Sequence, residues 1–449
     1  MKREQFLKKH GLKHYDTVEL RSGANLHAGT VMPADSGVPE DVLVLKLKSG
    51  YNVGVKLDAG AKVKRLGTLE KKILPSAKPQ HNPSLPTIAV LQAGGTIAAM
   101  VDYETGGVSA KLSDGQLLAM FPQLAEIANF RCRFLMNELS ENIRLSQYPL
   151  IANAAAEEVK KGVKGVIITH GTDTMGYTAA ALSFMFENLP VPVLLVGAQR
   201  SSDRGSTDAA LNMKCAANFI SKSDFAGVAI CMHENLEDES CLILPATKTR
   251  KMHTSRRDAF RAINARPIAR VSGEGKVDFI SGAYARKSAS AKFSLKAKIE
   301  EKVALVKAVP SLHAEQIGIL RKLGMKGVVI EGTGLGHAPT GGNGKKERAQ
   351  NEKVLRAISS LAKSGAVVAM ASQCINGRVR MHVYSAGVLL AKAGVLGCED
   401  MLPETALIKL AWLLGNYKKS EVPALFQKNL RGEISQSTPL DVFPQDFVP

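Results

Sequence analysis

Two segments of the chain run from an apolar, β-branched stretch into a glycine turn that ends on threonine. They are TIAVLQAGGTIAA, with Gly95 before Thr96, and GVIITHGTDTM, with Gly171 before Thr172 and Asp173. Glycine adopts backbone angles that other residues avoid, so such a turn brings its N–H groups close to a ligand. A hydroxyl at the carboxyl end of a parallel strand lies where open α/β sheets bind ligands. The two turns predict nucleophile chemistry with N–H donors nearby.

Each turn also has a simpler interpretation, because threonine and aspartate are good helix N-caps at the end of any strand. A threonine hydroxyl is moreover a weak nucleophile that needs a base, and a desolvated lysine amine can serve. Lys251, in TRKMHTSRRDAF, is such a candidate. Its alternative is a solvated lysine within the cationic group Lys248, Arg250, Arg256 and Arg257. The residues alone leave this choice open.

Composition indicates two or three domains of α/β type in 449 residues, with 45% hydrophobic and 5% aromatic content. The net charge of +18 favours a polyanionic partner such as RNA, unless the chain comes from a generally basic proteome. Six cysteines without metal spacing predict reduced thiols and no metal site. The chain has neither a secretory signal nor an apolar run of membrane-spanning length, so we expect an intracellular protein without membrane contact. His170 and His337, beside glycine turns, are predicted to be turn or core histidines.

The rhythm of the sequence divides the chain. Residues 1–75 carry short runs of alternating apolar and polar residues, which are typical of a small all-β barrel. The Pro- and Lys-rich stretch that follows predicts a linker over residues 76–86. Strands then alternate with helices, which predicts parallel pairing. The expected parts are an α/β lobe over 87–284, an inter-lobe linker over 285–302, a second α/β lobe over 303–415 and a tail over 416–449. We expect the tail to dock on a partner or on the barrel.

Several motifs appear in the order found in bacterial-type L-asparaginases: LQAGGTIA, ITHGTDTM, VLLVGAQR and RKMHTS. The segments MASQCINGRVRMHVYSAG and AGVLGCEDMLPETALIKL resemble the C-terminal signature of the same family. The resemblance covers about residues 87–415. It implies a two-lobe parallel α/β body whose active sites are completed across a dimer contact.

The resemblance also implies roles for individual residues. Thr96 matches the threonine that becomes acylated, while Thr172, Asp173 and Lys251 match the group that activates the hydroxyl. Ser140 and Glu141, in MNELSENIR, fall where family members bind the substrate's α-carboxylate and amine. Gly95 and Gly171 would contribute to substrate binding through their N–H groups. Tyr103 lies near the expected lid tyrosine, but its spacing differs.

A short barrel ahead of an asparaginase-like body resembles the D-type subunit of the archaeal-type glutamyl-tRNA(Gln) amidotransferase. This resemblance implies a glutaminase that supplies ammonia to the E-type subunit of that enzyme, which amidates Glu-tRNA(Gln) using ATP and Mg²⁺. It implies no cofactor on this chain, tRNA(Gln) in the complex, a homodimer through the body in an α2β2 assembly, and a cytoplasmic location. The segment GGNGKKE departs from a P-loop, because Pro339 occupies the first glycine position and no Ser or Thr follows Lys345.

Two alternatives stay open on the sequence. The chain could be a free-standing L-asparaginase or glutaminase with an accessory N-terminal domain. It could also be a non-catalytic RNA-binding or scaffold protein that kept an inactive asparaginase body. The second alternative is the weaker one, because all four expected catalytic side chains are present.

Overall fold

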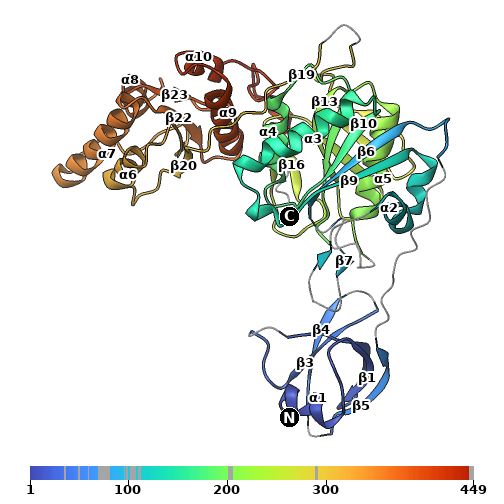
Figure 1. The fold of residues 1–449 in the computed structure, drawn as a ribbon. Coiled ribbons are helices and arrows are strands. Elements are labelled where there is room, and N and C mark those ends of the chain that lie inside the picture. Colours follow the sequence, from blue (N-terminus) through green and yellow to red (C-terminus); the bar gives the residue numbers. More distant parts are fainter. Residues whose placement is uncertain are drawn as a thin grey trace.

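The computed structural model describes residues 1–34, 37–48, 51–58, 60–68, 81–95, 97, 100–101, 108–109, 113–200, 206–288 and 292–443. A small β sheet forms the N-terminal part, a large α/β lobe follows, and a smaller α/β lobe lies beside the large one (Figure 1). The predicted fold class, a two-lobe α/β body behind a small β domain, is confirmed.

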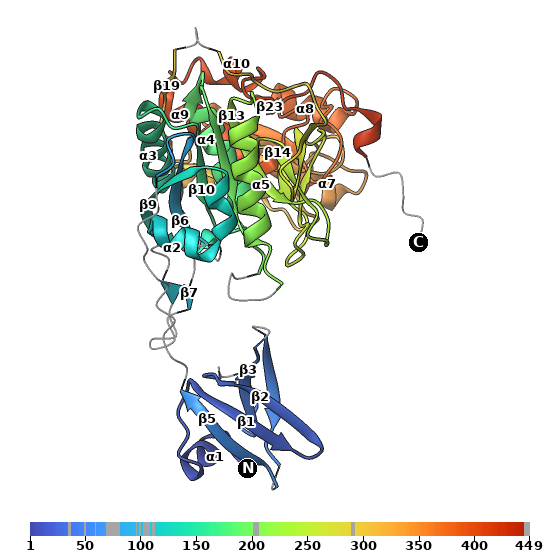
Figure 2. The ribbon, with the colours of Figure 1, turned by 90° about the vertical axis from the view of Figure 1, so that its right-hand side faces the viewer.

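The N-terminal part is an antiparallel sheet with strand order β4-β3-β2-β1-β5. Its strands are β1 Asp16–Ser22, β2 Asn25–Val31, β3 Val42–Lys46, β4 Asn52–Lys56 and β5 Lys62–Thr68. The polar lead before it forms a helix, α1 (Arg3–Lys9), which the sequence analysis did not predict. Phe6 and Leu7 of α1 are buried with Val18 and Leu20 in a core that belongs to this part alone. Figure 2 shows the N-terminal sheet set apart from the body. Residues 69–80, which include the first part of the linker predicted over 76–86, lie outside the described residues.

The large lobe is built on a mixed sheet with strand order β18-β17-β14-β13-β12-β10-β6-β9. Its strands are β6 Thr87–Gly94, β9 Asn129–Glu138, β10 Gly165–Thr169, β12 Pro192–Val196, β13 Gly227–His233, β14 Ser240–Pro245, β17 Ala269–Ser272 and β18 Val277–Phe279. The five strands from β9 to β13 are parallel, as predicted. The strands β14, β17 and β18 extend the sheet in antiparallel pairing instead. Only residues 234–239 join β13 to β14, which is too short for the crossover that parallel strands need.

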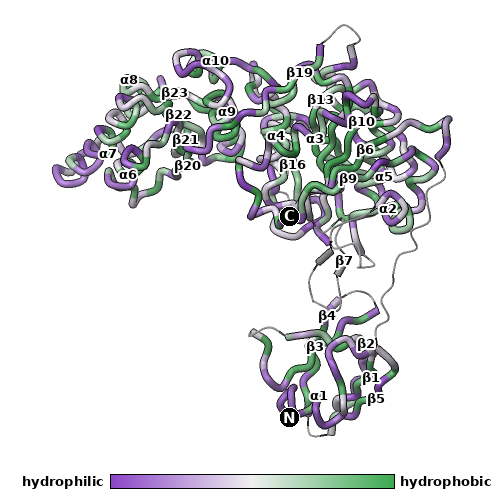
Figure 3. The backbone as a smooth tube through the Cα atoms, in the orientation of Figure 1, coloured by the Kyte–Doolittle hydropathy of each residue, from purple (hydrophilic) through white to green (hydrophobic). Residues whose placement is uncertain are grey.

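Helices cover both faces of this sheet: α2 Asp114–Met120, α3 Tyr148–Lys160, α4 Met175–Met185 and α5 Ala209–Lys222. Alternate residues of each central strand enter different cores. In β10, Ile168 packs in the core that contains α3 and α4, whereas Ile167 packs in the core that contains α2 and α5. The central parallel strands β6, β10, β12 and β13 are therefore mainly apolar, as strands buried on both faces must be (Figure 3), whereas the edge strand β9 is partly exposed.

The strand order places a switch point at β6. The chain passes from β6 to β9 on one side and reaches β10 on the other, so β6 and β10 are neighbours. Leu91 of β6 pairs with Ile168 of β10, and Gln92 pairs with Thr169. In doubly wound sheets, the crevice beyond the carboxyl ends of two such strands is where ligands bind. Both glycine–threonine turns follow these two ends.

Short elements complete the large lobe. The two-stranded pairs are β7 Met100–Val101 with β8 Val108–Ser109, β11 Phe186–Glu187 with β19 Ser294–Leu295, and β15 Thr249–Lys251 with β16 Phe260–Ala262. The 3₁₀ turns are η1 Pro122–Glu126, η2 Ser140–Asn142, η3 Leu145–Gln147 and η4 Leu440–Val442. The pairing of β19 with β11 shows that the predicted inter-lobe linker docks on the large lobe on its way to the small lobe.

The small lobe has a parallel sheet of β20 Val303–Lys307, β21 Gly327–Gly332, β22 Val367–Ser372 and β23 Val395–Gly397. Its helices are α6 Ala314–Lys322, α7 Lys345–Lys363, α8 Ser385–Lys392 and α9 Pro403–Asn416, and α10 Val422–Phe426 follows. Helix α9 joins the two lobes, because it packs on β20 and β21 and also on α4 of the large lobe. Phe184 of α4 and Trp412 of α9 stack with ring centroids 5.6 Å apart.

The prediction for the C-terminal tail is corrected. Its described residues dock on the body of the same chain rather than on the barrel. Arg431 donates from Nε to the carbonyl of Ser183 at 2.9 Å. Glu433 forms an ion pair with Lys409 of α9 at 2.5 Å, and both side chains are fully buried. A buried carboxylate requires such a partner, which ties the tail to α9.

All six cysteines are free thiols. Among the helices of the described ranges, none combines the length and apolarity needed to span a bilayer.

Candidate active site

Three of the predicted site residues meet beyond the carboxyl end of β10. The Nζ atom of Lys251 donates to Thr172 Oγ1 at 2.8 Å and to Asp173 Oδ1 at 2.7 Å. The side chain of Lys251 is 14% exposed, whereas that of Asp173 is 64% exposed. Lys251 is therefore not a solvated lysine, and its role as a base stays a prediction. Asp173 presents a carboxylate to solvent, where a ligand can reach it.

Two different parts of the sheet position this cluster. Thr172 and Asp173 lie between β10 and the first turn of α4, so the positive end of the helix dipole faces them. Lys251 ends β15 and pairs with Phe260 of β16, whose side chain is fully buried. The buried Phe260 ring anchors the β15–β16 hairpin, and the hairpin in turn holds the Lys251 amine next to Thr172.

Ser140 packs against this turn from the end of β9. It is buried, its Oγ accepts a hydrogen bond from the backbone N–H of Asp173 at 3.2 Å, and its carbonyl accepts one from Thr174 Oγ1 at 2.6 Å. A Cβ on Gly171 would lie 2.7 Å from the Cβ of Ser140, so only glycine fits there. Glu141 is exposed next to Ser140 and has no hydrogen bond or ion pair to the other predicted site residues that the structure describes.

The turn after β6 lies against the turn after β10. Gly95 has φ +86°, and a Cβ on it would come within 2.5 Å of the carbonyl carbon of His170. Glycine is therefore required here both by the backbone angle and by the contact. Thr96, the next residue, lies outside the described residues, as does Tyr103.

His170 is a structural histidine of the core, as predicted. Its Nδ1 lies 2.7 Å from the carbonyl of Gly171, and its Nε2 lies 2.8 Å from Thr178 Oγ1. Burial lowers the pKa of His170 to about 4, so the ring is neutral at physiological pH. His337 lies in the other lobe, with its ring edge-on to Tyr384 at 5.4 Å.

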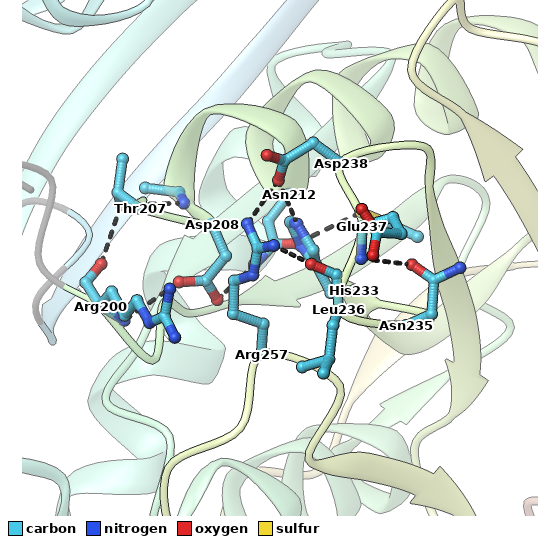
Figure 4. A network of polar contacts seen from close by, with 12 residues as sticks. Arg200, Thr207, Asp208, Asn212, His233, Asn235, Leu236, Glu237, Asp238 and Arg257 are labelled. Atoms are coloured by element: carbon cyan, nitrogen blue, oxygen red, sulfur yellow. Dashed lines mark hydrogen bonds and ion pairs between the residues drawn. The ribbon is translucent and has the colours of Figure 1, made fainter. Parts of the chain in front are cut away.

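A polar network supports the neighbouring loops (Figure 4). The buried Asp208 accepts backbone hydrogen bonds from Gln199 and Arg200, both at 3.0 Å, and thereby holds the loop after β12. Asn212 donates to the carbonyl of Gly197 at 2.9 Å.

His233 connects this loop to the segment after Lys251. Its ring nitrogens lie 2.6 Å from Asn212 Oδ1 and 3.1 Å from Asp238 Oδ1, and burial lowers the pKa of His233. Arg257, in the loop that follows Lys251, reaches Asp238 at 2.6 Å. The network links the two loops that flank the cluster.

Several supporting residues could not be identified from the sequence. Thr174 lies inside the quoted motif ITHGTDTM, yet its hydrogen bond to Ser140 could not be read from it. Lys248 and Arg250 were grouped with solvated cations, but Lys248 is fully buried and paired with Asp400 at 2.7 Å. In the segment Lys248 to Lys251, alternate residues point to opposite sides of the chain, as in a strand. This alternation could have shown that Lys248 and Arg250 face away from the site while Lys251 faces it.

The arrangement suits acyl transfer. It offers a hydroxyl in contact with an amine, an accessible carboxylate to hold a substrate ammonium, and backbone N–H groups at glycine turns. Within the described ranges, no group of three or more His, Cys, Asp or Glu side chains could hold a metal ion.

Family models match nearly the whole chain. "GatD N-terminal domain" matches residues 12–66, "Asparaginase, N-terminal" matches 87–284, and "Glutaminase/Asparaginase C-terminal domain" matches 302–426. Among solved structures, the L-asparaginase of Thermococcus kodakarensis superposes with a TM-score of 0.68 and 30% identity, covering 78% of this chain and 100% of its own. L-asparaginase I of Vibrio cholerae gives a TM-score of 0.67 and 28% identity over 78% of this chain and 99% of its own.

Relatives that include the N-terminal part are more similar. The D-type subunit of the glutamyl-tRNA(Gln) amidotransferase of Pyrococcus horikoshii is 43% identical over 99% of this chain and 100% of its own length. The same subunits of Pyrococcus furiosus and Methanothermobacter thermautotrophicus are 44% and 40% identical, over 99% and 98% of this chain and 100% and 98% of their own lengths. Both resemblances inferred from the motifs are thereby confirmed. The chain belongs to the family of D-type subunits of glutamyl-tRNA(Gln) amidotransferase, a family with an L-asparaginase-like body.

Proposed function

We propose that this chain is the glutaminase subunit of a tRNA-dependent amidotransferase, which converts Glu-tRNA(Gln) to Gln-tRNA(Gln). The chain would hydrolyse glutamine and pass the ammonia to its partner. The observation that carries this proposal is the contact of Lys251 with Thr172 and Asp173 in a full-length relative of the D-type subunits.

In the proposed mechanism, Thr96 Oγ attacks the side-chain carboxamide carbon of glutamine. Its proton passes through the Thr172 hydroxyl to the neutral amine of Lys251, and the backbone N–H groups of Gly95 and Gly171 stabilise the oxyanion. The C–N bond then breaks, ammonia leaves with the proton, and water hydrolyses the acyl-threonine to glutamate. After this proton transfer, the Lys251 ammonium would donate to Thr172 Oγ1 and Asp173 Oδ1, both of which lie within hydrogen-bond distance of its Nζ.

Substrate recognition would use charges at the rim of the site. The exposed carboxylate of Asp173 suits the α-ammonium of glutamine, and such a charge-assisted contact is stronger than a neutral one. Ser140 and Glu141 are proposed to bind the α-carboxylate and amine, since they lie beside Asp173 at the end of β9.

The proposed assembly contains the E-type subunit, which would bind ATP and Mg²⁺ and activate Glu-tRNA(Gln), so this chain needs no cofactor of its own. The body would form a homodimer within an α2β2 complex, and the net charge of +18 supports contact with tRNA. A role in aminoacyl-tRNA synthesis would require the chain to act in the cytoplasm, which is the location we propose. We also propose the domain boundaries predicted from the sequence, which follow residues 75, 86, 284, 302 and 415.

Ammonia release from glutamine tests the proposal. The purified chain is assayed alone and then with the E-type subunit, ATP and Glu-tRNA(Gln), with asparagine as the competing substrate. We expect glutamine hydrolysis to rise at least tenfold when the partner and charged tRNA are present. Rapid asparagine hydrolysis by the chain alone, without any response to the partner, would instead identify a free-standing asparaginase.

A further inference from the structure

The strand that carries Lys251 has two differently occupied faces. Successive side chains of a strand point to opposite sides. Lys251 points to Thr172 and Asp173 of the large lobe. Arg250, the preceding residue of β15, forms an ion pair with the small-lobe residue Glu404. Lys248, just before the strand, forms one with the small-lobe residue Asp400. The small-lobe segment from Asp400 to Glu404, at the start of α9, therefore anchors β15 on the face opposite Lys251.

The first anchor is deeply buried. Lys248 Nζ lies 2.7 Å from Asp400 Oδ2 and donates to the Asp400 carbonyl at 2.9 Å. Thr405 Oγ1 donates to the carbonyl of Thr247 at 2.9 Å, just before the strand. Asp400 also accepts from the backbone of Ser435 at 2.9 Å, so the C-terminal tail joins the same anchor.

The second anchor lies closer to Lys251. Arg250 Nε pairs with Glu404 Oε1 at 3.0 Å, and the side chain of Glu404 is 16% exposed. Tyr177 of α4 interacts electrostatically with Arg250 and Glu404. Burial raises the pKa of Tyr177 to about 12, and the negative charge of Glu404 adds to this effect. A Cβ on Gly176 would lie 3.2 Å from the carbonyl of Thr249, so the start of α4 also lies against β15.

Helix α9 thus contacts the two elements that carry the halves of the cluster. It packs on α4, which follows Thr172 and Asp173, and its Glu404 pairs with Arg250 of β15, which carries Lys251. A shift of the small lobe would change the distance between these halves. Catalytic proton transfer is sensitive to displacements of this kind, because it requires heavy atoms at hydrogen-bond distance.

We propose that Glu404 and Arg250, supported by the Asp400–Lys248 pair, are positioning residues that hold Lys251 at Thr172. This inference rests on the proposed function and adds a residue set from the small lobe to its site. It also predicts that the small lobe sets the rate of the large lobe's chemistry through one strand.

The test uses the full chain assembled with the E-type subunit and Glu-tRNA(Gln), and compares Glu404→Gln with Glu300→Gln. Glu300 is a matched control, because it is 17% exposed and pairs with Lys326 of the same lobe, away from β15. We expect Glu404→Gln to lower kcat for glutamine hydrolysis about tenfold with KM within twofold, and Glu300→Gln to leave both within twofold. Equal effects of the two substitutions would reject the positioning role.

A double-mutant cycle separates positioning from general stability. If Glu404 acts through Lys251, then Glu404→Gln should have less than a twofold effect on the residual kcat of Lys251→Ala. A tenfold loss in both backgrounds would identify a merely structural residue and overturn the proposal. If the wild-type complex releases no ammonia from glutamine, the proposed function fails instead, which is a distinct result.

Amide hydrogen exchange gives a readout that does not depend on activity. The N–H of Met252 donates to Ala259 at 2.6 Å and that of Ile263 donates to Lys248 at 2.7 Å, so both report on the hairpin that contains Lys251. We expect at least tenfold faster exchange at these amides in Glu404→Gln and unchanged exchange in Glu300→Gln. Unchanged exchange in Glu404→Gln would overturn the proposal even if kcat fell.

Discussion

At the scale of single residues, Lys251 has two partners with different tasks. In the proposed mechanism Thr172 offers a hydroxyl on the proton path, whereas Asp173 offers a carboxylate that also faces solvent. The amine would then serve both the chemistry and the charge balance of the site. Replacing it tests the chemistry with little effect on folding, because the partly exposed pair with Asp173 contributes at most about 1 kcal/mol.

Lys251→Met should lower kcat for glutamine hydrolysis by about 10²–10⁴-fold, the usual contribution of a positioned base. The thermal midpoint should stay within about 2 °C of wild type. Lys276→Met is the control, because Lys276 pairs with Asp278 at an exposed edge of the sheet. Steady-state ammonia release and calorimetry make the comparison, and an unchanged kcat would remove Lys251 from the site.

His170 makes a second residue-scale prediction, for stability against pH. Its folded pKa of about 4 lies below the ordinary value of 6.5, because burial disfavours the charged ring. The unfolded chain therefore binds the proton more strongly between these two values. Stability is complete above about pH 6.5, falls as the pH drops toward 4, and loses about 3 kcal/mol in total.

The measurement compares unfolding of wild type with that of His170→Gln at pH 7 and at pH 5. We expect wild type to lose about 2 kcal/mol more than the variant over this interval. The subtraction removes the contribution of other groups, including His233, whose pKa burial also lowers. Equal losses in the two proteins would show that His170 is not protonated on unfolding.

At the scale of elements, the parallel strands β6, β10, β12 and β13 could be predicted from sequence because each is mainly apolar. The parallel edge strand β9 was not predicted, because NFRCRFLMNE carries arginines and is partly exposed. Ile167 and Ile168 of β10 enter opposite cores, and no polar position interrupts them. The antiparallel strands β17 and β18 could not be predicted in this way, because ARVS and VDF are short and partly exposed. Helix α1 was missed because Phe6 and Leu7 are two apolar residues among charges.

The residues of the candidate site also fall into those that local sequence can identify and those that it cannot. Motifs could name Thr172, Asp173 and Lys251, because each lies in a characteristic segment. The partners that hold them could not be named, since Asp400 and Glu404 are about 150 residues away from β15 in sequence. Contacts between lobes depend on tertiary packing, and no local pattern specifies them. The same holds for the tail, whose position depends on the Lys409–Glu433 pair.

This buried pair gives the element-scale prediction. Glu433→Gln should destabilise the chain by about 3–5 kcal/mol, because it leaves the Lys409 ammonium uncompensated in the interior. Adding Lys409→Met should recover part of the loss, since the second change removes the unpaired charge while the glutamine oxygen can still accept from the Leu430 and Arg431 amides. Denaturant unfolding of the two variants measures the difference. No recovery in the double variant would mean that the pair is not the tail's main anchor.

At the scale of the whole molecule, the N-terminal sheet and the body have separate cores. A hydroxyl contact between Tyr51 and Ser206, at 2.5 Å, reaches from one to the other. Parts with their own cores usually fold on their own. The N-terminal part also carries charge: residues 1–68 contain 12 Lys and Arg against 7 Asp and Glu. We therefore expect it to serve assembly rather than catalysis.

Removing residues 1–80 should leave glutamine hydrolysis by the isolated body within about threefold of the full chain, because Thr172, Asp173 and Lys251 all lie beyond the cut. The affinity for the complex of the E-type subunit with tRNA should fall, and its dependence on salt should become shallower, since fewer basic side chains release counterions. Titrations of both forms at several salt concentrations give the two slopes. Equal slopes would show that the N-terminal charges do not contact RNA. A folded body without hydrolysis would show that the N-terminal sheet completes the active site, and the separation of assembly from chemistry would then be wrong.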